Sequence, residues 1–429
     1  MEKVIYKRLL NYLDKNKLIH DHQFGFRKGR STVQAIHTIV ENVINNIEAG
    51  DLTLSIFLDL SKAFDTVDHG LLLRKLEACG IRGVTLDWFN SYLTNRTQFT
   101  EVNGVVSSVC DLTCGVPQGS ILGPLLFLIY IDGIFSCSKI ALTVGFADDT
   151  AMEYAAKDIR TLISTANNDL VNIAHWFNMN KLSLNATKTK YMILAPRQKL
   201  SQVDFEHVDS VKISDVAIKR VVEINYLGVI IDDSLSWNLQ IASVCSKVAK
   251  ANGILSMVKG FVPSYLLRIL YFSYVYPSVL YAISVWGSVS DYKMQQIQIL
   301  QKRSVRLIAN ADFCAHTLPL FKRFSLLKIV QIYRYTVCLH THSVIHNLRV
   351  HPTPYQNIIR IRAFIDNHDH NTRNHDLFVL PKCRTNFTKL SLLYNSVSIW
   401  NSLPIVIKNE MKLGKFKILV KELFMSEMI

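Results

Sequence analysis

Two short apolar segments rich in β-forming residues meet at a pair of aspartates, Asp148-Asp149, between residues 141 and 154. A third aspartate, Asp59, lies near the end of another apolar segment at residues 52–60. Apolar runs of this length with polar boundaries are typical of buried strands. A carboxylate at the end of a buried strand is held rigidly and faces whatever lies beyond the sheet. The pattern therefore predicts neighbouring strands with acidic groups at their ends.

Longer amphipathic segments surround these strands, so the chain is predicted to be an α+β protein. Amphipathic helices are expected at residues 2–18, 31–48, 71–79, 84–93 and 159–177, and a buried helix is expected in the apolar run 121–130. A hairpin is expected at 99–109 around Asn103-Gly104, and a strand pair at 221–231 around Gly228. From residue 239 onward helices dominate, and 351–354 is expected to be a linker.

Charge and composition favour a polyanionic partner. The 429 residues are 49% hydrophobic, which excludes a mostly disordered chain, and the formal net charge is +14. Residues 301–429 hold 19 Lys and Arg against 7 Asp and Glu. This basic region, with aromatic residues such as Tyr333 and Trp400, is expected to contact RNA, although a solvated basic surface is the simpler alternative.

Cysteine usage and hydropathy predict an intracellular protein, nuclear or cytoplasmic and not secreted. The eight cysteines include no C-x-x-C pair and no signal peptide precedes them, so they are expected to be reduced. The longest apolar run, 121–131, is too short to span a bilayer, so no membrane partner is expected. The histidines of the tail, such as His342 and His346, are weak candidates for metal binding.

The three aspartates suit two-metal phosphoryl transfer. Carboxylates on neighbouring strand ends hold two Mg²⁺ ions in enzymes of this class. An Asp-Asp pair by itself is common, and the second pair, Asp232-Asp233, is interpreted as an ordinary turn. Between Asp59 and Asp148 lies the loop 115–124, whose glycines allow the backbone to approach a ligand closely. Ser120 alone would fit an ordinary helix N-cap, but a cap does not account for the whole ten-residue segment 115–124.

These segments resemble the ordered motifs of LINE-type (non-LTR retrotransposon) reverse transcriptases. Residues 58–67, 115–124 and 146–149 resemble motifs A, B and C, and 22–32 is similar to the segment before motif A. Residues 182–189 resemble motif D, and Tyr226-Leu227-Gly228 resembles motif E, the primer grip. The resemblance covers roughly residues 1–310 and is specific, because six motifs occur in the family's order.

The resemblance implies a right-hand polymerase and assigns roles by matching position. Asp59, Asp148 and Asp149 would hold the Mg²⁺ ions. Gln118 and Gly119 would contact the incoming nucleotide and the template. Phe64, five residues after Asp59, matches an aromatic steric gate that excludes a ribose 2′-hydroxyl. The expected partners are an RNA template, a DNA primer and dNTPs.

Five other residues have less specific roles. Lys188 is a candidate general acid for the leaving pyrophosphate, and a surface lysine fits about equally well. Arg27 and Arg30 are candidates for phosphate or template binding, with a solvated face nearly as good an interpretation. Asp65 and Asp68 are expected to interact with the N-terminus of the following helix rather than with metal.

The implied organisation is partial fingers at 1–50, a palm with an antiparallel sheet at 51–232, a helical thumb at 233–318 and a mostly helical basic region at 319–429. The basic stretch that precedes the opening helix in full-length relatives has no counterpart here, so the sequence is expected to be an N-terminally truncated fragment. The main hypothesis is an RNA-templated DNA polymerase. The alternatives are a catalytically weak or inactive remnant that binds nucleic acid, and a two-metal phosphohydrolase, which leaves Phe64 and the Gln118 loop unexplained.

Overall fold

The computed structural model describes residues 1–205, 207–346, 348 and 377–428. These residues form two compact units: unit 1 comprises 1–35 and 51–221, and unit 2 comprises 36–50 and 222–429. Helix α2 (Thr32–Ala49) contributes its first turn to unit 1 and the rest to unit 2. The predicted linker at 351–354 lies outside the described residues, as do four of the C-terminal histidines, His351, His368, His370 and His375.

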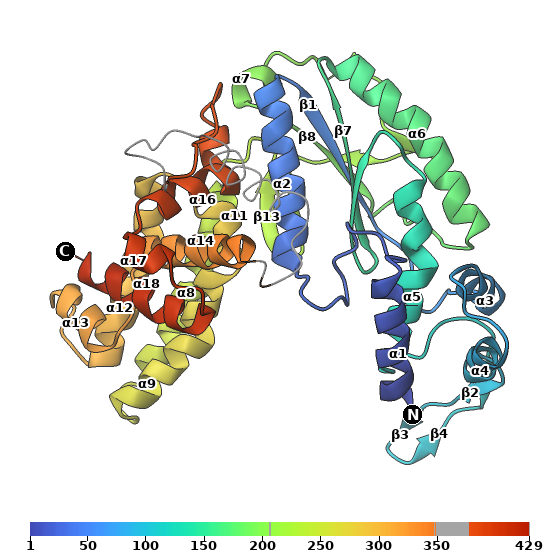
Figure 1. The fold of residues 1–429 in the computed structure, drawn as a ribbon, viewed down its shortest axis with the longest axis horizontal. Helices are drawn as coiled ribbons and strands as arrows, with labels where there is room; N and C mark the ends of the chain where they lie inside the picture. Colours follow the sequence, from blue (N-terminus) through green and yellow to red (C-terminus); the bar gives the residue numbers. More distant parts are fainter. Residues whose placement is uncertain (206, 347, 349–376, 429) are drawn as a thin grey trace. The chain divides into compact units, whose positions relative to one another are not determined.

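Unit 1 is built on a five-stranded sheet in the order β11-β8-β1-β7-β6. Strands β8, β1 and β7 of this sheet are labelled in Figure 1. The central strand β1 (Leu52–Leu58) is antiparallel to both neighbours and is buried along its whole length. Antiparallel pairing also joins β6 to β7, whereas β11 runs parallel to β8. The bounds of the other strands are β6 (Leu142–Phe146), β7 (Asp149–Ala156), β8 (Lys190–Leu194) and β11 (Lys219–Arg220). The predicted α+β class with a central antiparallel sheet is confirmed.

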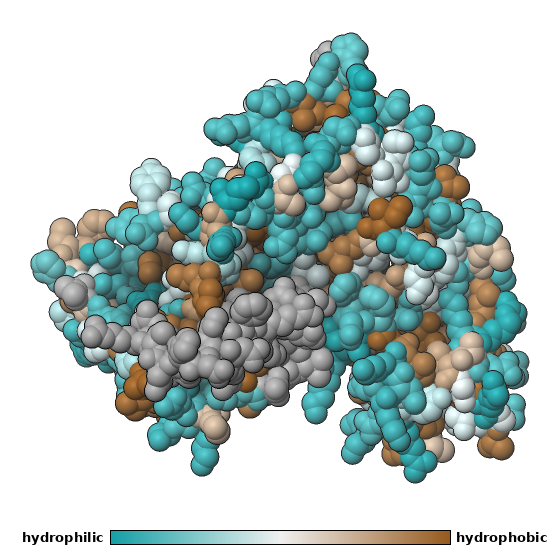
Figure 2. Space-filling view, turned by 45° about the horizontal axis from the view of Figure 1, so that its top comes forward, coloured by the Kyte–Doolittle hydropathy of each residue, from teal (hydrophilic) through white to brown (hydrophobic). Residues whose placement is uncertain are grey.

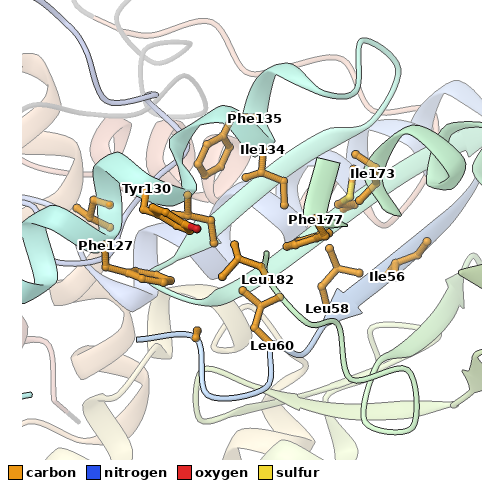
Figure 3. Packing of buried hydrophobic residues seen from close by; sticks show 14 of the residues in the cluster. Ile56, Leu58, Leu60, Phe127, Tyr130, Ile134, Phe135, Ile173, Phe177 and Leu182 are labelled. Carbon is orange, nitrogen blue, oxygen red and sulfur yellow. The ribbon is translucent and has the colours of Figure 1, made fainter. Parts of the chain in front are cut away.

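Two helices, α5 and α6, contribute to the core beside this sheet. Helix α6 (Ile159–Met179) starts at the N-cap Asp158, whose carboxylate accepts from the Thr161 N–H at 2.9 Å, and packs on β1 and β7. Helix α5 (Gly123–Ile131) is buried almost all round, which explains its nearly uniform apolar sequence. Figure 3 shows Phe127 and Tyr130 of α5 converging on side chains from β1 and α6.

The remaining elements of unit 1 surround this core or form small hairpins. The predicted hairpin at 99–109 is present as two short ladders, β2 with β5 and β3 with β4. The helices are α1 (Glu2–Lys15), α3 (His69–Ala78), α4 (Val84–Leu93), η1 (Asp132–Ser136) and α7 (Arg197–Leu200). The strands are β2 (Arg96–Gln98), β3 (Glu101–Val102), β4 (Val105–Val106), β5 (Cys110–Leu112), β9 (Lys212–Ile213) and β10 (Val216–Ala217).

Unit 2 is mainly helical, apart from one hairpin of β12 (Glu223–Tyr226) and β13 (Val229–Asp232). Its first helices are α8 (Asn238–Val258), α9 (Ser264–Leu270), η2 (Tyr271–Val275), α10 (Tyr276–Leu280), α11 (Ile283–Trp286) and α12 (Asp291–Ala309). The later ones are α13 (Thr317–Arg323), α14 (Ile329–Ile345), η3 (Thr388–Leu390), α16 (Leu392–Asn401), α17 (Ile405–Lys408) and α18 (Leu413–Ser426). The predicted helical character beyond residue 239 is confirmed for the described residues.

Two aromatic residues of the C-terminal region, Tyr333 and Trp400, belong to the core of unit 2. Tyr333 is 7% exposed and Trp400 is 4% exposed. The ring of Trp400 stacks on Phe416 at 5.7 Å, and Phe416 also stacks on His342. The expectation that Tyr333 and Trp400 contact RNA is therefore wrong, because their rings are packed inside the protein.

Two glutamates of α2 hold the C-terminal segment that precedes α16. The Glu41 carboxylate is buried and accepts the Leu392 N–H. The Glu48 carboxylate accepts the Thr385 and Thr388 hydroxyls, each at 2.6 Å, and the backbone N–H groups of Arg384 and Thr385. Residues 377–428 are thus integrated into unit 2, so truncating the C-terminal region would remove part of its core.

We expect Glu41→Gln to change how stability depends on pH. Burial raises the pKa of Glu41 from 4.5 to about 7, although the Leu392 N–H opposes the shift. The folded state therefore keeps a proton that the unfolded chain releases, and this contribution is full below pH 4.5 and lost as the pH rises through about 7. The free energy of urea unfolding should fall from pH 5 to pH 8 by about 3 kcal/mol more in wild type than in Glu41→Gln.

Glu48→Gln is the matched control for this prediction. Burial alone would raise the pKa of Glu48, but its hydrogen bonds outweigh burial and lower the pKa to about 2. Its titration therefore affects stability in acid and not between pH 5 and pH 8. An identical fall in the wild type and in Glu41→Gln would contradict the prediction.

The described helices include none that is both long and apolar enough to cross a bilayer. The face of the molecule in Figure 2 is mainly hydrophilic, with hydrophobic residues in separate patches.

Candidate active site

Strand register brings the predicted acidic residues to one end of the sheet in unit 1. The last residue of β1, Leu58, pairs with Thr150 of β7. Asp59 directly follows the last residue of β1, and Asp149 is the first residue of β7. The two aspartates therefore lie at the same end of adjacent strands. Asp148 lies in the two-residue turn between β6 and β7, where Phe146 pairs with Asp149. The structure therefore brings the three predicted carboxylates to neighbouring positions.

The electrostatics of Asp149 reflect this arrangement. The pKa of Asp149 is raised, first by partial desolvation of its carboxylate and then by the negative charges of Asp148 and Asp59. The residue as a whole is nevertheless exposed, so an ion from solvent has access to the carboxylate. Like charges held close together destabilise one another, and a bound cation relieves that repulsion.

The donor chemistry of this site fits magnesium. Carboxylate oxygens are the ligands that Mg²⁺ prefers, and Asp59, Asp148 and Asp149 supply them from adjacent strand ends. Among the described residues, no group of three or more His, Cys, Asp or Glu side chains meets the geometry of a metal site. The strand ends that carry Asp59, Asp148 and Asp149 are nevertheless adjacent, so these three residues could hold a cation between them.

The loop after β1 is joined to the glycine-rich loop before α5. The N–H groups of Gly115 and Val116 donate to the carbonyls of Val67 and Phe64, at 2.8 and 3.0 Å. Gly115 has a φ of +88°, and a Cβ on it would lie 2.9 Å from the carbonyl oxygen of Asp65. A glycine is required here because the two loops touch through their backbones.

Phe64 projects from this junction and is half-buried. Its ring stacks on Phe127 of α5, with centroids 4.2 Å apart and planes at 26°. Phe26 approaches edge-on at 6.2 Å. The position of the Phe64 ring is therefore fixed by aromatic packing on two sides.

Gln118 and Gly119 are exposed at the tip of the glycine-rich loop. The Gln118 Nε2 donates to Asp65 Oδ1 at 2.6 Å, which holds the amide over the loop that follows β1. Of the two expected helix-terminal partners, Asp68 is confirmed, since it is the N-cap of α3 and accepts the Leu71 N–H at 2.8 Å. The expectation for Asp65 is wrong, because its carboxylate binds Gln118 instead.

Lys188 lies in a loop that contacts the end of β1. The Asn185 N–H donates to the Asp59 carbonyl at 2.9 Å, and the Thr189 Oγ1 accepts the Asp59 N–H at 3.2 Å. Lys188 lies between these contacts, bonded through its own N–H to Asn185, and its side chain is exposed. The loop thus links Lys188 to the strand that carries Asp59.

Arg27 and Arg30 are bonded to their own segment of the chain. Arg27 donates to the His20 carbonyl at 2.7 Å, and Arg30 donates to the carbonyl and the carboxylate of Asp21 at 2.6 and 2.9 Å. The pKa of Arg30 is lowered, first by burial and then by the positive charge of Arg27. These contacts give both side chains a structural task in holding residues 20–30.

The predicted primer grip lies in unit 2. Leu227 and Gly228 form the turn of the β12–β13 hairpin with φ values of +47° and +82°, and Tyr226 is buried. The Tyr281 hydroxyl donates to the Leu227 carbonyl at 2.5 Å. Near the end of this hairpin, Asp232 accepts the N–H groups of Ser236 and Trp237 at 2.8 Å, which confirms that Asp232-Asp233 forms a turn.

Two residues that contact the acidic turn are absent from the predicted set. Gln23 is 1% exposed and bonds through its side chain to Ala147, and Gly25 packs against the same residue. The sequence contained one signal for them. Gln23 and Gly25 belong to the segment 22–32, which resembles a family motif without carrying an obvious catalytic group.

Comparison with known proteins supports the predicted relationship. The chain is 25% identical over 333 residues to "Probable RNA-directed DNA polymerase from transposon X-element" of Drosophila melanogaster, covering 76% of this chain and 36% of that protein. It is 27% identical over 328 residues to "RNA-directed DNA polymerase from mobile element jockey" of the same organism, covering 74% and 35%. A telomerase structure from Candida albicans has 9% identity and a TM-score of 0.40, covering 75% of this chain and 54% of that chain.

The chain spans about a third of the length of the curated relatives it matches. Residues 1–231 match the family described as Reverse transcriptase (RNA-dependent DNA polymerase). This match covers more than half of the 429 residues and includes the three aspartates, Phe64, Gln118 and the β12–β13 turn. The chain therefore belongs to the reverse transcriptase family, as its ordered motifs predicted.

Proposed function

We propose that the chain is the RNA-templated DNA polymerase core of a non-LTR retrotransposon, which extends a DNA primer with dNTPs. The observation that carries the proposal is the register of β1 and β7, which brings Asp59 beside Asp149 and Asp148. The Phe64 loop follows β1 directly, so a nucleotide at these carboxylates has an aromatic ring as its neighbour. An intracellular location, nucleus or cytoplasm, belongs to the same proposal, with all eight cysteines unpaired.

Two Mg²⁺ ions held by Asp59, Asp148 and Asp149 would activate the primer 3′-hydroxyl and neutralise the triphosphate. The aspartates orient the reacting groups, because each lies at or beside the end of a paired strand. Phe64 excludes a ribose 2′-hydroxyl, and Gln118 and Gly119 contact the nucleotide and template from the opposing loop. Lys188 would donate a proton to the departing pyrophosphate.

The domain assignment is part of the proposal. Residues 51–232 act as the palm, 1–50 as partial fingers, 233–318 as the thumb and 319–429 as a basic C-terminal region. The thumb and the C-terminal region both lie in unit 2, together with residues 36–50 of α2. The primer grip at Tyr226, Leu227 and Gly228 belongs to the same unit. Arg27 and Arg30 support the fingers through their contacts with His20 and Asp21. Their side chains are 12% and 3% exposed, which leaves little surface for template phosphate.

Primer extension tests the proposal directly. The full chain is incubated with oligo(dT) annealed to poly(rA), dTTP and Mg²⁺, and elongated products are resolved on a denaturing gel. Extension on the RNA template supports the polymerase. Template binding without extension supports the second candidate, an inactive remnant that binds nucleic acid.

We expect basic residues of unit 2 to determine the salt dependence of template binding. Between residues 234 and 346 the sequence holds twelve Lys and Arg against two acidic residues. The pKa of Lys328 is lowered by burial and then by the charges of Lys302 and Lys322, which indicates clustered cations. Replacing all three lysines by Gln should reduce the slope of log K against log salt by about 2, because each phosphate contact contributes roughly 0.7 for a single strand.

A triple Lys→Gln variant of exposed lysines in unit 1, Lys139, Lys212 and Lys219, serves as the control. It removes the same formal charge from the other unit. Filter binding of a labelled RNA from 50 to 300 mM KCl provides both slopes. Equal slopes for the two variants would show that the unit 2 cluster is only solvated.

A further inference from the structure

Residues 22–25 extend the sheet of unit 1 beyond its edge strand. The Gly145 N–H donates to the His22 carbonyl at 2.9 Å, and the Phe24 N–H donates to the Gly145 carbonyl at 2.8 Å. Gln23 thereby forms a parallel bridge with Gly145 of β6. This short pairing lies two residues before the turn that carries Asp148.

The side chain of Gln23 satisfies both backbone polar groups of Ala147. Its Oε1 accepts the Ala147 N–H at 3.0 Å, and its Nε2 donates to the Ala147 carbonyl at 3.3 Å. The same Oε1 accepts the Gly25 N–H at 2.9 Å. Gln23 is 1% exposed and Ala147 is 5% exposed, so water is largely excluded from replacing these bonds.

Ala147 needs this support because its backbone is strained. Its φ of +59° lies in the left-handed region, which a residue with a Cβ rarely adopts. Such conformations persist where surrounding contacts over-determine them, and they often occur at functional sites. The strained residue directly precedes Asp148, so the conformation of Ala147 sets the direction in which the acidic turn projects.

Gly25 makes this arrangement sterically feasible. A Cβ at Gly25 would lie 2.2 Å from the Ala147 nitrogen and 2.9 Å from its Cα. Both are backbone atoms, which do not move aside as a flexible side chain would. A side chain at position 25 would therefore displace the acidic turn or its supporting segment.

We propose that Gln23 is a positioning residue for catalysis, which clamps the Ala147 peptide so that Asp148 and Asp149 stay aligned with Asp59. The inference rests on the proposed polymerase function. The carboxylates would bind the cations, whereas Gln23 acts indirectly by holding the turn that carries Asp148. Without this clamp, Asp148 and Asp149 would move away from Asp59, and cation binding would weaken. The reaction would slow because the carboxylates would no longer hold the reacting groups in the productive geometry.

Gln23→Met is the principal test, because it retains the length and approximate volume of the side chain and removes all three hydrogen bonds. The extension rate at limiting Mg²⁺ should fall by roughly one to two orders of magnitude, with partial recovery at high Mg²⁺. Template affinity should stay unchanged. Gln23→Glu retains an acceptor for Ala147 but loses the amide donor and adds a negative charge near the carboxylates, so it should remain defective.

Asn167→Leu is the matched control. Both polar atoms of the Asn167 amide also bond to the backbone. The nitrogen donates to the Ser210 carbonyl at 3.0 Å, and the oxygen accepts the Lys212 N–H at 2.9 Å. It belongs to α6 and to unit 1 but clamps a different segment. This variant should lose some stability and keep the wild-type dependence on Mg²⁺, which separates positioning from general destabilisation.

Amide hydrogen exchange of a peptide spanning residues 143–152 provides a readout that does not depend on activity. Exchange in this peptide should be faster in Gln23→Met than in wild type and unchanged in Asn167→Leu. Unchanged exchange in Gln23→Met overturns the clamp, and faster exchange with an unchanged dependence on Mg²⁺ overturns the positioning role. If the wild type extends no primer, the proposed function and the catalytic role fail together, and faster exchange then identifies a purely structural clamp.

Discussion

Asp149→Asn should abolish primer extension, lowering kcat/KM by roughly three orders of magnitude while primer–template affinity stays within about twofold. The substitution is isosteric, so the pairing of Asp149 with Phe146 and the β6–β7 turn should survive. It removes a negative charge at the place where Asp59, Asp148 and Asp149 influence one another. The loss should fall on kcat, because the missing charge stabilises the cations that act on the transition state.

Asp111→Asn is a suitable control, because Asp111 is an exposed aspartate on β5 of the same unit. It should extend primers at the wild-type rate. Steady-state extension at varied dTTP measures kcat and kcat/KM for both variants, and fluorescence anisotropy measures primer–template affinity. Wild-type extension by Asp149→Asn would show that Asp149 is not part of the metal site.

The sequence was informative about the acidic site because its determinants are local. An apolar run predicts a buried strand, and a polar residue at its end must leave the core, so Asp59 was identified without knowledge of its neighbours. Asp148-Asp149 was distinguished from Asp232-Asp233 by the motifs around it. The structure supports this distinction, since the Asp232 carboxylate is engaged by the N–H groups of the following turn.

Contacts between residues that lie far apart in the sequence could not be predicted from local patterns. The Gln23 amide bonds to Ala147, 124 residues away in sequence, and Glu48 bonds to Thr385 across 337 residues. Residue type alone does not reveal such pairs, because a buried glutamine and a surface glutamine read the same in a sequence. Trp400 was misjudged for the same reason, since an aromatic ring suits both a core and a stacking surface.

Phe64→Val should admit ribonucleotides, raising the ratio of UTP to dTTP incorporation by roughly 10- to 200-fold. The side chain of Phe64, the proposed gate, is held by two aromatic contacts: its ring stacks on Phe127 at 4.2 Å and Phe26 meets it edge-on. Its backbone carbonyl accepts the Val116 N–H at 3.0 Å, which fixes the loop that carries it. A ring held this way cannot turn aside for a 2′-hydroxyl, whereas valine lacks the atoms that would collide with it.

Two further variants separate the ring itself from the packing around it. Phe64→Tyr retains the ring and should retain discrimination against UTP. Phe26→Val removes an exposed ring that meets Phe64 edge-on. Any loss of discrimination against UTP in this variant measures how far that contact fixes the position of Phe64. If Phe64→Val selects dTTP as strongly as wild type, the gate is another group. A large loss in Phe26→Val with none in Phe64→Val would assign the gate to Phe26, because that ring projects from the segment beside the acidic turn.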